Sequence, residues 1–311
     1  MHAPSSPAIS VVVLGYRNET TIVAAVASLM GQRSADPFEV VVVTSGGDGS
    51  AAAVRTAFPE VTVIDVEARL LPGGARNRGV EVARGAIMAF LAADCLATPG
   101  WIDAQLAAHR SGHAAVASAI STAPPDTVFA RAHTYDLCCS RLPGRPAGLV
   151  PAGDPAAHGI SFDRATLDRA GAFPEDLRIG EDSEMTRRLR DLGVPIWFEP
   201  RIVTAHHGPR TLRELLTDRH ARGFRSGRAA PGPRPSVGAV LRAFPGAWWV
   251  RLRWVLRTGW RHARGERTRY AVALPWLVIG HTAGEVGRAR GRLAGPAPTA
   301  GVAAEEPGRQ A

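Results

Sequence analysis

Residues 9–91 decide the fold, and they open with the run ISVVVL at Ile9–Leu14. Further short apolar runs follow, namely FEVVVV at 38–43, VTVIDV at 61–66 and AIMAFL at 86–91. Helix-like segments separate these runs, because apolar residues recur at helical spacing in 20–30 and helix-forming residues fill the stretches before 58 and 83. Four strands that alternate with helices predict a parallel, doubly wound sheet with right-handed crossovers. Ligands of such sheets bind beyond the carboxyl ends of the strands, so a site is expected in the loops after these runs.

Length and composition indicate a globular protein with a basic C-terminal third. The 311 residues suffice for one large domain, or for one domain with an appendage, and 45% of them are hydrophobic and 21% charged. Residues 1–200 hold 17 arginines against 22 acidic residues, whereas residues 201–311 hold 20 arginines against 6. Such asymmetry predicts an anionic partner, either nucleic acid, a membrane surface or a phosphate-rich ligand.

The cysteines and the first residues indicate a reducing compartment. Cys95, Cys138 and Cys139 lack the spacing of a metal site, and adjacent cysteines rarely form a useful disulfide. Residues 1–7 contain neither a basic n-region nor an apolar h-region, so no secretory signal is expected. A cytoplasmic protein is therefore predicted.

The loop after the first strand disfavours several enzyme classes. Gly15-Tyr16-Arg17-Asn18 stands where a dinucleotide-binding protein would carry G-x-G-x-x-G, and Asn18 is expected to cap the following helix. The sequence also contains no G-x-S-x-G nucleophile elbow and no Walker A loop. Nicotinamide-dependent, serine-hydrolase and P-loop chemistry are thereby disfavoured.

A set of ordered motifs resembles family 2 glycosyltransferases over roughly residues 8–230. The motifs share their order and spacing with that family. They are Ser10–Asn18, Gly74-Ala75-Arg76-Asn77-Arg78-Gly79, Leu91-Ala92-Ala93-Asp94 with Pro99-Gly100-Trp101, Gly171–Glu175, Gly180-Glu181-Asp182 with Arg188-Leu189, and Pro200 with His206. The resemblance implies a GT-A fold: a Rossmann-like, mostly parallel twisted sheet flanked by helices.

The acidic doublet Glu181-Asp182 carries the expected chemistry. The resemblance implies transfer of a sugar from a nucleoside-diphosphate donor to an acceptor hydroxyl in one inverting displacement, as in a hexosyltransferase. Asp182 would be the base, and Glu181 beside it would shape the local charge. The alternative is that the doublet only caps the helix expected over 183–191.

A divalent metal, Mg²⁺ or Mn²⁺, is implied on the donor side. Asp94 is the remaining carboxylate of the D-x-D position, because Ala92 replaces the first aspartate. His206, or its neighbour His207, could complete the site, since magnesium commonly takes only one or two protein carboxylates together with substrate phosphates. The alternative is a structural or surface histidine pair.

Further donor contacts are expected from loops and from a basic segment. The resemblance assigns them to Tyr16, Asn18, Thr44, Asp48, Arg76, Asn77, Asp94, Arg222 and Arg225. Thr44 stands where the family usually has an aspartate, which leaves the donor nucleotide open. Arg222 or Arg225 would contact the pyrophosphate, unless residues 212–227 form a charged solvated helix; for Arg76 the alternative is a solvated helix surface. Because two donor positions depart from the family, the alternative function is a catalytically impaired GT-A-fold scaffold at the membrane.

The C-terminal third predicts a membrane contact. We expect a catalytic domain over 1–230, a basic amphipathic helical segment over 231–293 and a disordered tail over 294–311. Tryptophan and arginine alternate in 237–260, which is typical of a membrane interface. The 15 uncharged residues of 270–284 are too few to span a bilayer, so they are interfacial or re-entrant, or else a core helix. The expected partners are a nucleotide sugar, a glycan or lipid-linked acceptor of the cell envelope and the inner face of the cell membrane, with no nucleic acid.

Overall fold

The computed structural model describes residues 6–151 and 158–295. The predicted alternation is confirmed: β1 (Ile9–Tyr16), β2 (Phe38–Ser45), β3 (Thr62–Val66) and β4 (Ile87–Ala92) are parallel and lie in the order β3-β2-β1-β4. Their carboxyl ends therefore meet at one edge of the sheet, as the site prediction requires.

The sheet continues beyond β4 with mixed pairing. The strands are β8 (Ser161–Asp163), β6 (Ala115–Thr122), β9 (Ile196–His206) and β5 (Cys95–Ala97), with β7 (Gly148–Leu149) also on β9. β8 is antiparallel to both β4 and β6, and β6 is parallel to β9. Two antiparallel steps restore the direction of β4, so β9 also ends at the edge where β1 and β4 end.

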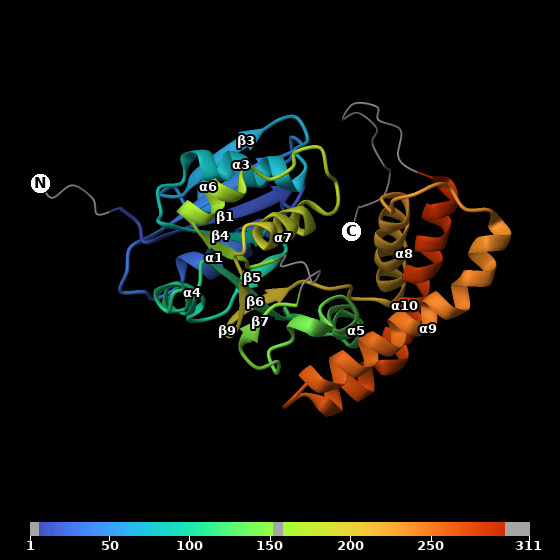
Figure 1. Cartoon of the computed structure of the whole chain (residues 1–311). Coiled ribbons are helices and arrows are strands. Elements are labelled where there is room, and N and C mark those ends of the chain that lie inside the picture. The colour runs from blue at the N-terminus through green and yellow to red at the C-terminus, as the bar shows by residue number, and fades with distance from the viewer. Residues whose placement is uncertain (1–5, 152–157, 296–311) are drawn as a thin grey trace, which may run out of the picture.

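Helices cover both faces of this sheet (Figure 1). α1 (Ile22–Met30), α2 (Ser50–Ala57) and α4 (Trp101–Arg110) pack on one core, and α3 (Pro72–Val82), α6 (Arg164–Ala170) and α7 (Glu181–Asp191) on the other. Val11 and Val13 of β1 belong to the first core and Val12 to the second, which explains why its run is apolar without alternation. The predicted α/β class and GT-A-like layering are confirmed.

A third core lies among the helices of the C-terminal part. It is formed by α5 (Val128–Leu137), the 3-10 turn Cys139–Arg141, α8 (Leu212–Arg228), α9 (Val237–His262) and α10 (Arg267–Ala294). The predicted boundary at 230/231 falls between α8 and α9, yet α8 and α10 on its two sides pack closely on each other. A Cβ on Gly223 would lie 1.9 Å from the Gly284 carbonyl oxygen, and one on Gly227 would lie 2.1 Å from that of Arg288. Only glycine permits this approach.

A buried ion cluster joins three of these helices, α5, α8 and α10. Asp136 of α5 lies 2.5 Å from the Arg219 guanidinium of α8 and 2.8 Å from the His281 imidazole of α10. Burial alone would raise the pKa of Asp136, but Arg219 and His281 hold that pKa below its usual value. The cluster therefore keeps a charged carboxylate inside the helical core, and it leaves Arg219 unlike a residue of a solvated helix.

One local prediction is wrong. Asn18 does not cap α1: its side-chain oxygen accepts a hydrogen bond from the Tyr16 N–H at 3.0 Å, and Thr21 is the residue that precedes the helix. The stretch 270–284 lies inside α10, where Ala273 and Leu277 are buried, so the core-helix alternative describes its inner side. Within the described residues, no helix is long and apolar enough to cross a membrane. Most of the predicted tail, from 296 onward, lies outside them.

The glycine contacts generate a stability prediction. Gly223→Ala should destabilise the protein by about 1–3 kcal/mol, because the added methyl group overlaps α10. Gly246→Ala is the matched control: Gly246 also lies inside a helix, but nothing approaches its Cβ position within 4 Å. The control should gain roughly 0.5–1 kcal/mol from helix propensity. Urea unfolding measures both, and equal stability of the two variants would contradict the close contact.

Candidate active site

The residues predicted for the site come from separate elements that end at one edge of the sheet. Tyr16 and Thr44 lie at the ends of β1 and β2, and Asp94 lies between β4 and β5. His206 is the last residue of β9, where it pairs with Cys95 of β5. The topology therefore brings these four predicted positions to the expected edge.

The first two loops are fastened to each other. Arg17 has a positive φ of 52°, and its Nε donates to the Gly46 carbonyl at 3.4 Å. Tyr16 packs on Gly46 so closely that a Cβ there would lie 2.7 Å from the ring, and Gly46 itself has a φ of 96°. The Arg69 guanidinium covers the same ring at 4.4 Å from its centroid. Tyr16 thus holds the loop after β2 in place, and Arg69 is a contact that no sequence motif indicated.

An unpredicted carboxylate lies beside Thr44. The Thr44 hydroxyl donates to Asp65 at 2.7 Å, across the register pair that joins the ends of β2 and β3. Asp65 is exposed, whereas Thr44 is buried. The predicted Asp48 instead accepts from the backbone N–H and the hydroxyl of Ser50, at the start of α2. A lone acid near the end of an apolar strand was the available signal for Asp65.

Arg76 and Glu181 form a buried ion pair between α3 and α7. Arg76 Nη1 lies 2.7 Å from Glu181 Oε1, and only 9% and 10% of the two side chains are exposed. The guanidinium also lies 5.1 Å from the Phe173 ring centroid. The solvated-surface alternative for Arg76 is therefore wrong. The charge of Glu181 is compensated within the protein.

Asn77 fastens the loop that leads to α7. Its Nδ2 donates to the Phe173 carbonyl and its Oδ1 accepts from the Phe173 N–H, both at 2.9 Å. Asn77 Nδ2 also donates to Glu175 at 2.8 Å. A Cβ on Gly73 would lie 1.9 Å from the Pro174 carbonyl oxygen, so α3 and this loop are in direct backbone contact.

Asp182 is the accessible member of the acidic doublet. Gly180 precedes α7 with a φ of 95°, and Asp182 Oδ1 accepts from the Ser183 N–H at 2.7 Å. Asp182 is half-buried and Glu181 is buried. Acidic residues in a first turn are stabilised by the helix dipole, so the capping alternative describes part of the role of the doublet.

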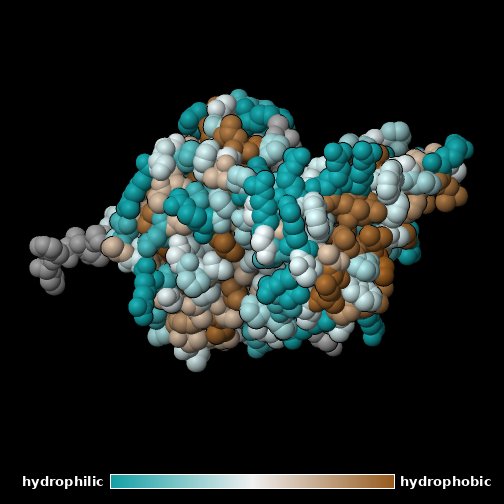
Figure 2. Space-filling model, turned by 90° about the horizontal axis from the view of Figure 1, so that it is seen from below, coloured by the Kyte–Doolittle hydropathy of each residue, from teal (hydrophilic) through white to brown (hydrophobic). Residues whose placement is uncertain are grey.

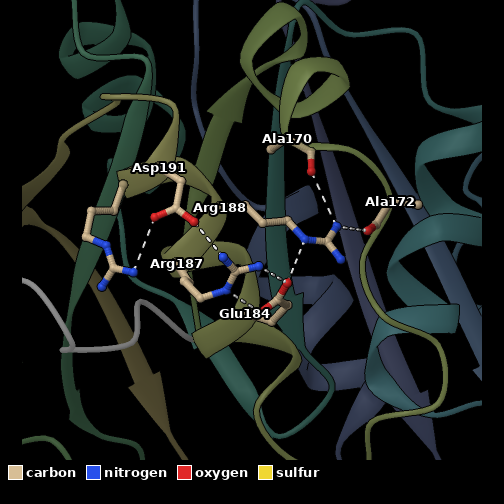
Figure 3. A network of polar contacts seen from close by, with 7 residues as sticks. Ala170, Ala172, Glu184, Arg187, Arg188 and Asp191 are labelled. Atoms are coloured by element: carbon tan, nitrogen blue, oxygen red, sulfur yellow. Dashed lines mark hydrogen bonds and ion pairs between the residues drawn. The ribbon is translucent and has the colours of Figure 1, made fainter.

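The body of α7 is anchored by arginines (Figure 3). Arg188 donates from Nη1 to the carbonyls of Ala170 and Ala172, at 3.3 and 2.7 Å, and from Nε to Glu184 at 2.9 Å. Arg187 adds a bidentate contact to Glu184. These bonds tie α7 to the end of α6, which restricts movement of the helix that carries Asp182.

Three potential metal ligands converge beside β9. Single donor atoms of Asp94, Cys95 and His206 all lie within 4.8 Å of one another. His206 Nε2 lies 3.7 Å from Asp94 Oδ2, which is too long for a hydrogen bond and suits ligands that each lie about 2.1 Å from one shared ion. An imidazole and a thiol are typical ligands of transition ions, whereas Mg²⁺ prefers oxygen ligands. His206, rather than His207, supplies the imidazole.

Histidines and an ion pair surround this cluster. The His206 ring lies 5.7 Å from His133 and 5.2 Å from His158, between centroids. His133 Nε2 contacts Asp218 at 2.9 Å, and Arg222 Nε donates to the same carboxylate at 2.8 Å.

The charges of this surrounding shell act on the metal cluster. Burial would raise the pKa of Asp94, but His206, His158 and Arg222 hold it below its usual value. α8 thus brings the predicted Arg222 to the cluster, and the half-buried Arg225 lies on the same helix. His133, His158 and Asp218 were not predicted, because no local pattern marks them.

Comparison with known proteins assigns the chain to a family. The model of glycosyl transferase family 2 matches residues 10–166, which is half of the sequence. The chain belongs to this family. It is 27% identical over 239 residues to pre-mycofactocin glycosyltransferase of Mycobacterium tuberculosis, covering 73% of this chain and 48% of that protein, so it spans about half the length of that relative. It is 25% identical over 216 residues to the glycosyltransferase AglE of Haloferax volcanii, covering 68% and 70%.

Solved structures share the fold at low identity. A mannosyltransferase of Pyrobaculum calidifontis, in complex with GDP-Man and Mn²⁺, superposes with a TM-score of 0.56 at 21% identity, covering 92% of this chain and 88% of that one. TarS of S. aureus, in complex with UDP-GlcNAc, gives 0.51 at 18%, covering 72% and 68%. Both confirm the predicted GT-A architecture.

The buried ion pair generates one prediction. Arg76→Met should lower the free energy of unfolding by about 3–5 kcal/mol, because it leaves Glu181 charged and unpaired. Adding Glu181→Leu should recover most of that loss. Arg78→Met is the control on the same helix, since its pair with Glu81 is more than half exposed and contributes under about 1 kcal/mol. If the double variant is no more stable than Arg76→Met, as measured by urea unfolding, the two charges are not coupled.

The cluster of Asp94, Cys95 and His206 generates a second prediction for this site. Asp94→Asn and His206→Ala should each weaken Mn²⁺ binding at least about tenfold, because each removes a ligand atom. Isothermal titration of the purified protein measures this without any turnover. His113→Ala is the control, because that ring stacks on Trp197 and lies outside the cluster. Unchanged affinity in both ligand variants would exclude this metal site.

Proposed function

We propose that the protein transfers a sugar from a nucleoside-diphosphate donor to an acceptor hydroxyl with inversion, and that Asp182 is the base. This proposal rests on the different surroundings of the two acidic residues, Glu181 and Asp182. Arg76 neutralises Glu181, so Asp182 remains as the accessible carboxylate at the start of α7. α3 begins after β3 at the carboxyl edge of the sheet, and its pair with Glu181 holds the start of α7 toward that edge.

The reaction balances with the groups available. Asp182 accepts the proton of the acceptor hydroxyl while the oxygen of that hydroxyl attacks the anomeric carbon. The bond from this carbon to the diphosphate oxygen breaks on the opposite face of the sugar. The leaving diphosphate carries the developing negative charge, for which Arg222 is a fixed positive charge beside Asp94. A divalent ion held by Asp94 and His206, with Cys95, would neutralise the same charge.

The other residues of the site divide into contacts and supports. The Asp65 carboxylate accepts from Thr44 and has acceptor capacity left for a nucleobase N–H or a ribose hydroxyl, and Tyr16 offers an aromatic surface at the loop after β2. Arg76, Asn77 and Glu181 are positioning residues, because their polar atoms bond α3 to α7 and to the loop at Phe173.

Although Ala92 and Thr44 differ from the family pattern, other residues supply carboxylate and ligand groups on the donor side. Cys95 and His206 accompany Asp94 in one cluster, although Ala92 offers no ligand. Asp65 supplies a carboxylate beside Thr44, where the second strand itself lacks one. These substitutes favour the enzyme over the scaffold alternative.

The base assignment is tested by Asp182→Asn. We expect turnover to fall about 100- to 10,000-fold, because the amide cannot accept the proton, while donor affinity stays within a small factor. Release of nucleotide from a panel of UDP-, GDP- and dTDP-sugars, with Mn²⁺ and hydroxyl acceptors, measures turnover, and titration calorimetry measures binding.

Asp191→Asn, at the far end of the same helix, is the control and should keep its activity. A variant of Asp182 that keeps most of its turnover would refute the base. If the unaltered protein neither binds nor cleaves any donor of the panel, the enzyme proposal itself fails.

A further inference from the structure

One face of α9 exposes large apolar side chains to solvent. Trp249 and Trp254 are each 53% exposed, Val250 is 67% exposed and Trp260 is 46% exposed. The opposite face carries Leu252, Val255 and Gly259, which are buried. Leu252, Val255 and Gly259 recur at intervals of three and four positions, which places them on one side, so the helix has an inner and an outer side. Figure 2 shows hydrophobic surface gathered on the part of the molecule that holds α9 and α10.

The outer side of α9 is also strongly basic. None of its 26 residues is acidic, and the exposed arginines are Arg242, Arg251, Arg253, Arg257 and Arg261. Among them Arg251 is different, because it forms an ion pair with Glu285 of α10. Glu285 is buried and is the single acidic residue of α10, so its charge points inward. The outer side therefore carries positive charge with no acidic residue of its own helix beside it.

This combination fits one class of partner. Tryptophan and arginine also occur together in protein interfaces, but charged residues are depleted at the core of such an interface, and here four exposed arginines share the face with the tryptophans. Tryptophan prefers the head-group region of a bilayer, and each arginine near an anionic lipid surface adds about 1 kcal/mol of attraction. An amphipathic helix of this composition lies in the plane of the membrane surface.

We propose that the outer side of α9 docks this protein on an anionic lipid bilayer. Trp249, Val250 and Trp254 enter the head-group region, and Arg253 and Arg257 bind lipid phosphates. The surface is separate from Asp182 and from the metal ligands, so the inference does not depend on the transfer reaction.

The test uses the full chain and sedimentation with lipid vesicles. We expect binding to vesicles of phosphatidylcholine with phosphatidylglycerol, little binding to phosphatidylcholine alone, and weaker binding as salt is raised. Arg253→Gln and Arg257→Gln should each weaken binding about fivefold. Val250→Asp should weaken it further, since it places a negative charge in the docking face.

Val82→Asp is the matched control, because Val82 is 44% exposed on α3, far along the chain from α9. All variants should unfold at the same urea concentration as the unaltered protein, and all should keep their activity on water-soluble acceptors. Absence of binding to anionic vesicles overturns the proposal, and so does binding that Val250→Asp leaves unchanged. Self-association, or binding to duplex DNA, that Val250→Asp abolishes while vesicle binding is absent would instead assign the face to that partner.

Discussion

The ion pair between Arg76 and Glu181 is the interaction on which the candidate site depends. It joins α3, which follows the third parallel strand, to α7, which follows the antiparallel insertion at β8. Two charges that are nine-tenths buried tolerate little displacement, because separating them leaves each desolvated without compensation. Asn77 and Gly73 reinforce the same junction through the loop at Phe173. The position of Asp182 relative to the sheet edge follows from this junction rather than from α7 alone.

Much of the fold was predictable because local pattern and burial agree in its first ninety residues. A strand buried on both faces reads as a nearly continuous apolar run, and β1, β2 and β4 each contain such a run of at least four residues. The second half of the sheet was not predictable in the same way. β8 has three residues and β7 two, and segments so short adopt extended structure because of their partners. The close packing of α8 on α10 was not predictable either. The glycines at 223, 227, 284, 287 and 291 are visible in the sequence, but their contact depends on how the two helices are aligned in the fold.

The candidate site likewise contains residues that local sequence patterns indicate and residues that they do not. Asp94, His206 and Asp182 could be proposed from the sequence because each stands at a fixed distance from a recognisable run or turn. Asp65, His133 and His158 could not, since their relevance arises only where strands and helices from distant parts of the chain meet. Arg76 is an intermediate case. Its position in the motif was visible in the sequence, but only its packing against Phe173 and Glu181 distinguishes a buried guanidinium from a solvated one.

The glycine contact between α8 and α10 has a consequence for the exchange of parts among relatives. Arg222, which donates to Asp218, is carried by a helix whose other side packs on α10 backbone to backbone. A recombination point in the turn at 229–236 would pair an α8 from one parent with an α10 from another, and any side chain at the seam would push the two apart. α8 and α10 therefore have to be exchanged as one block. A join upstream of Leu212 keeps these two helices together, provided that α5 keeps Asp136, the partner of Arg219 and His281.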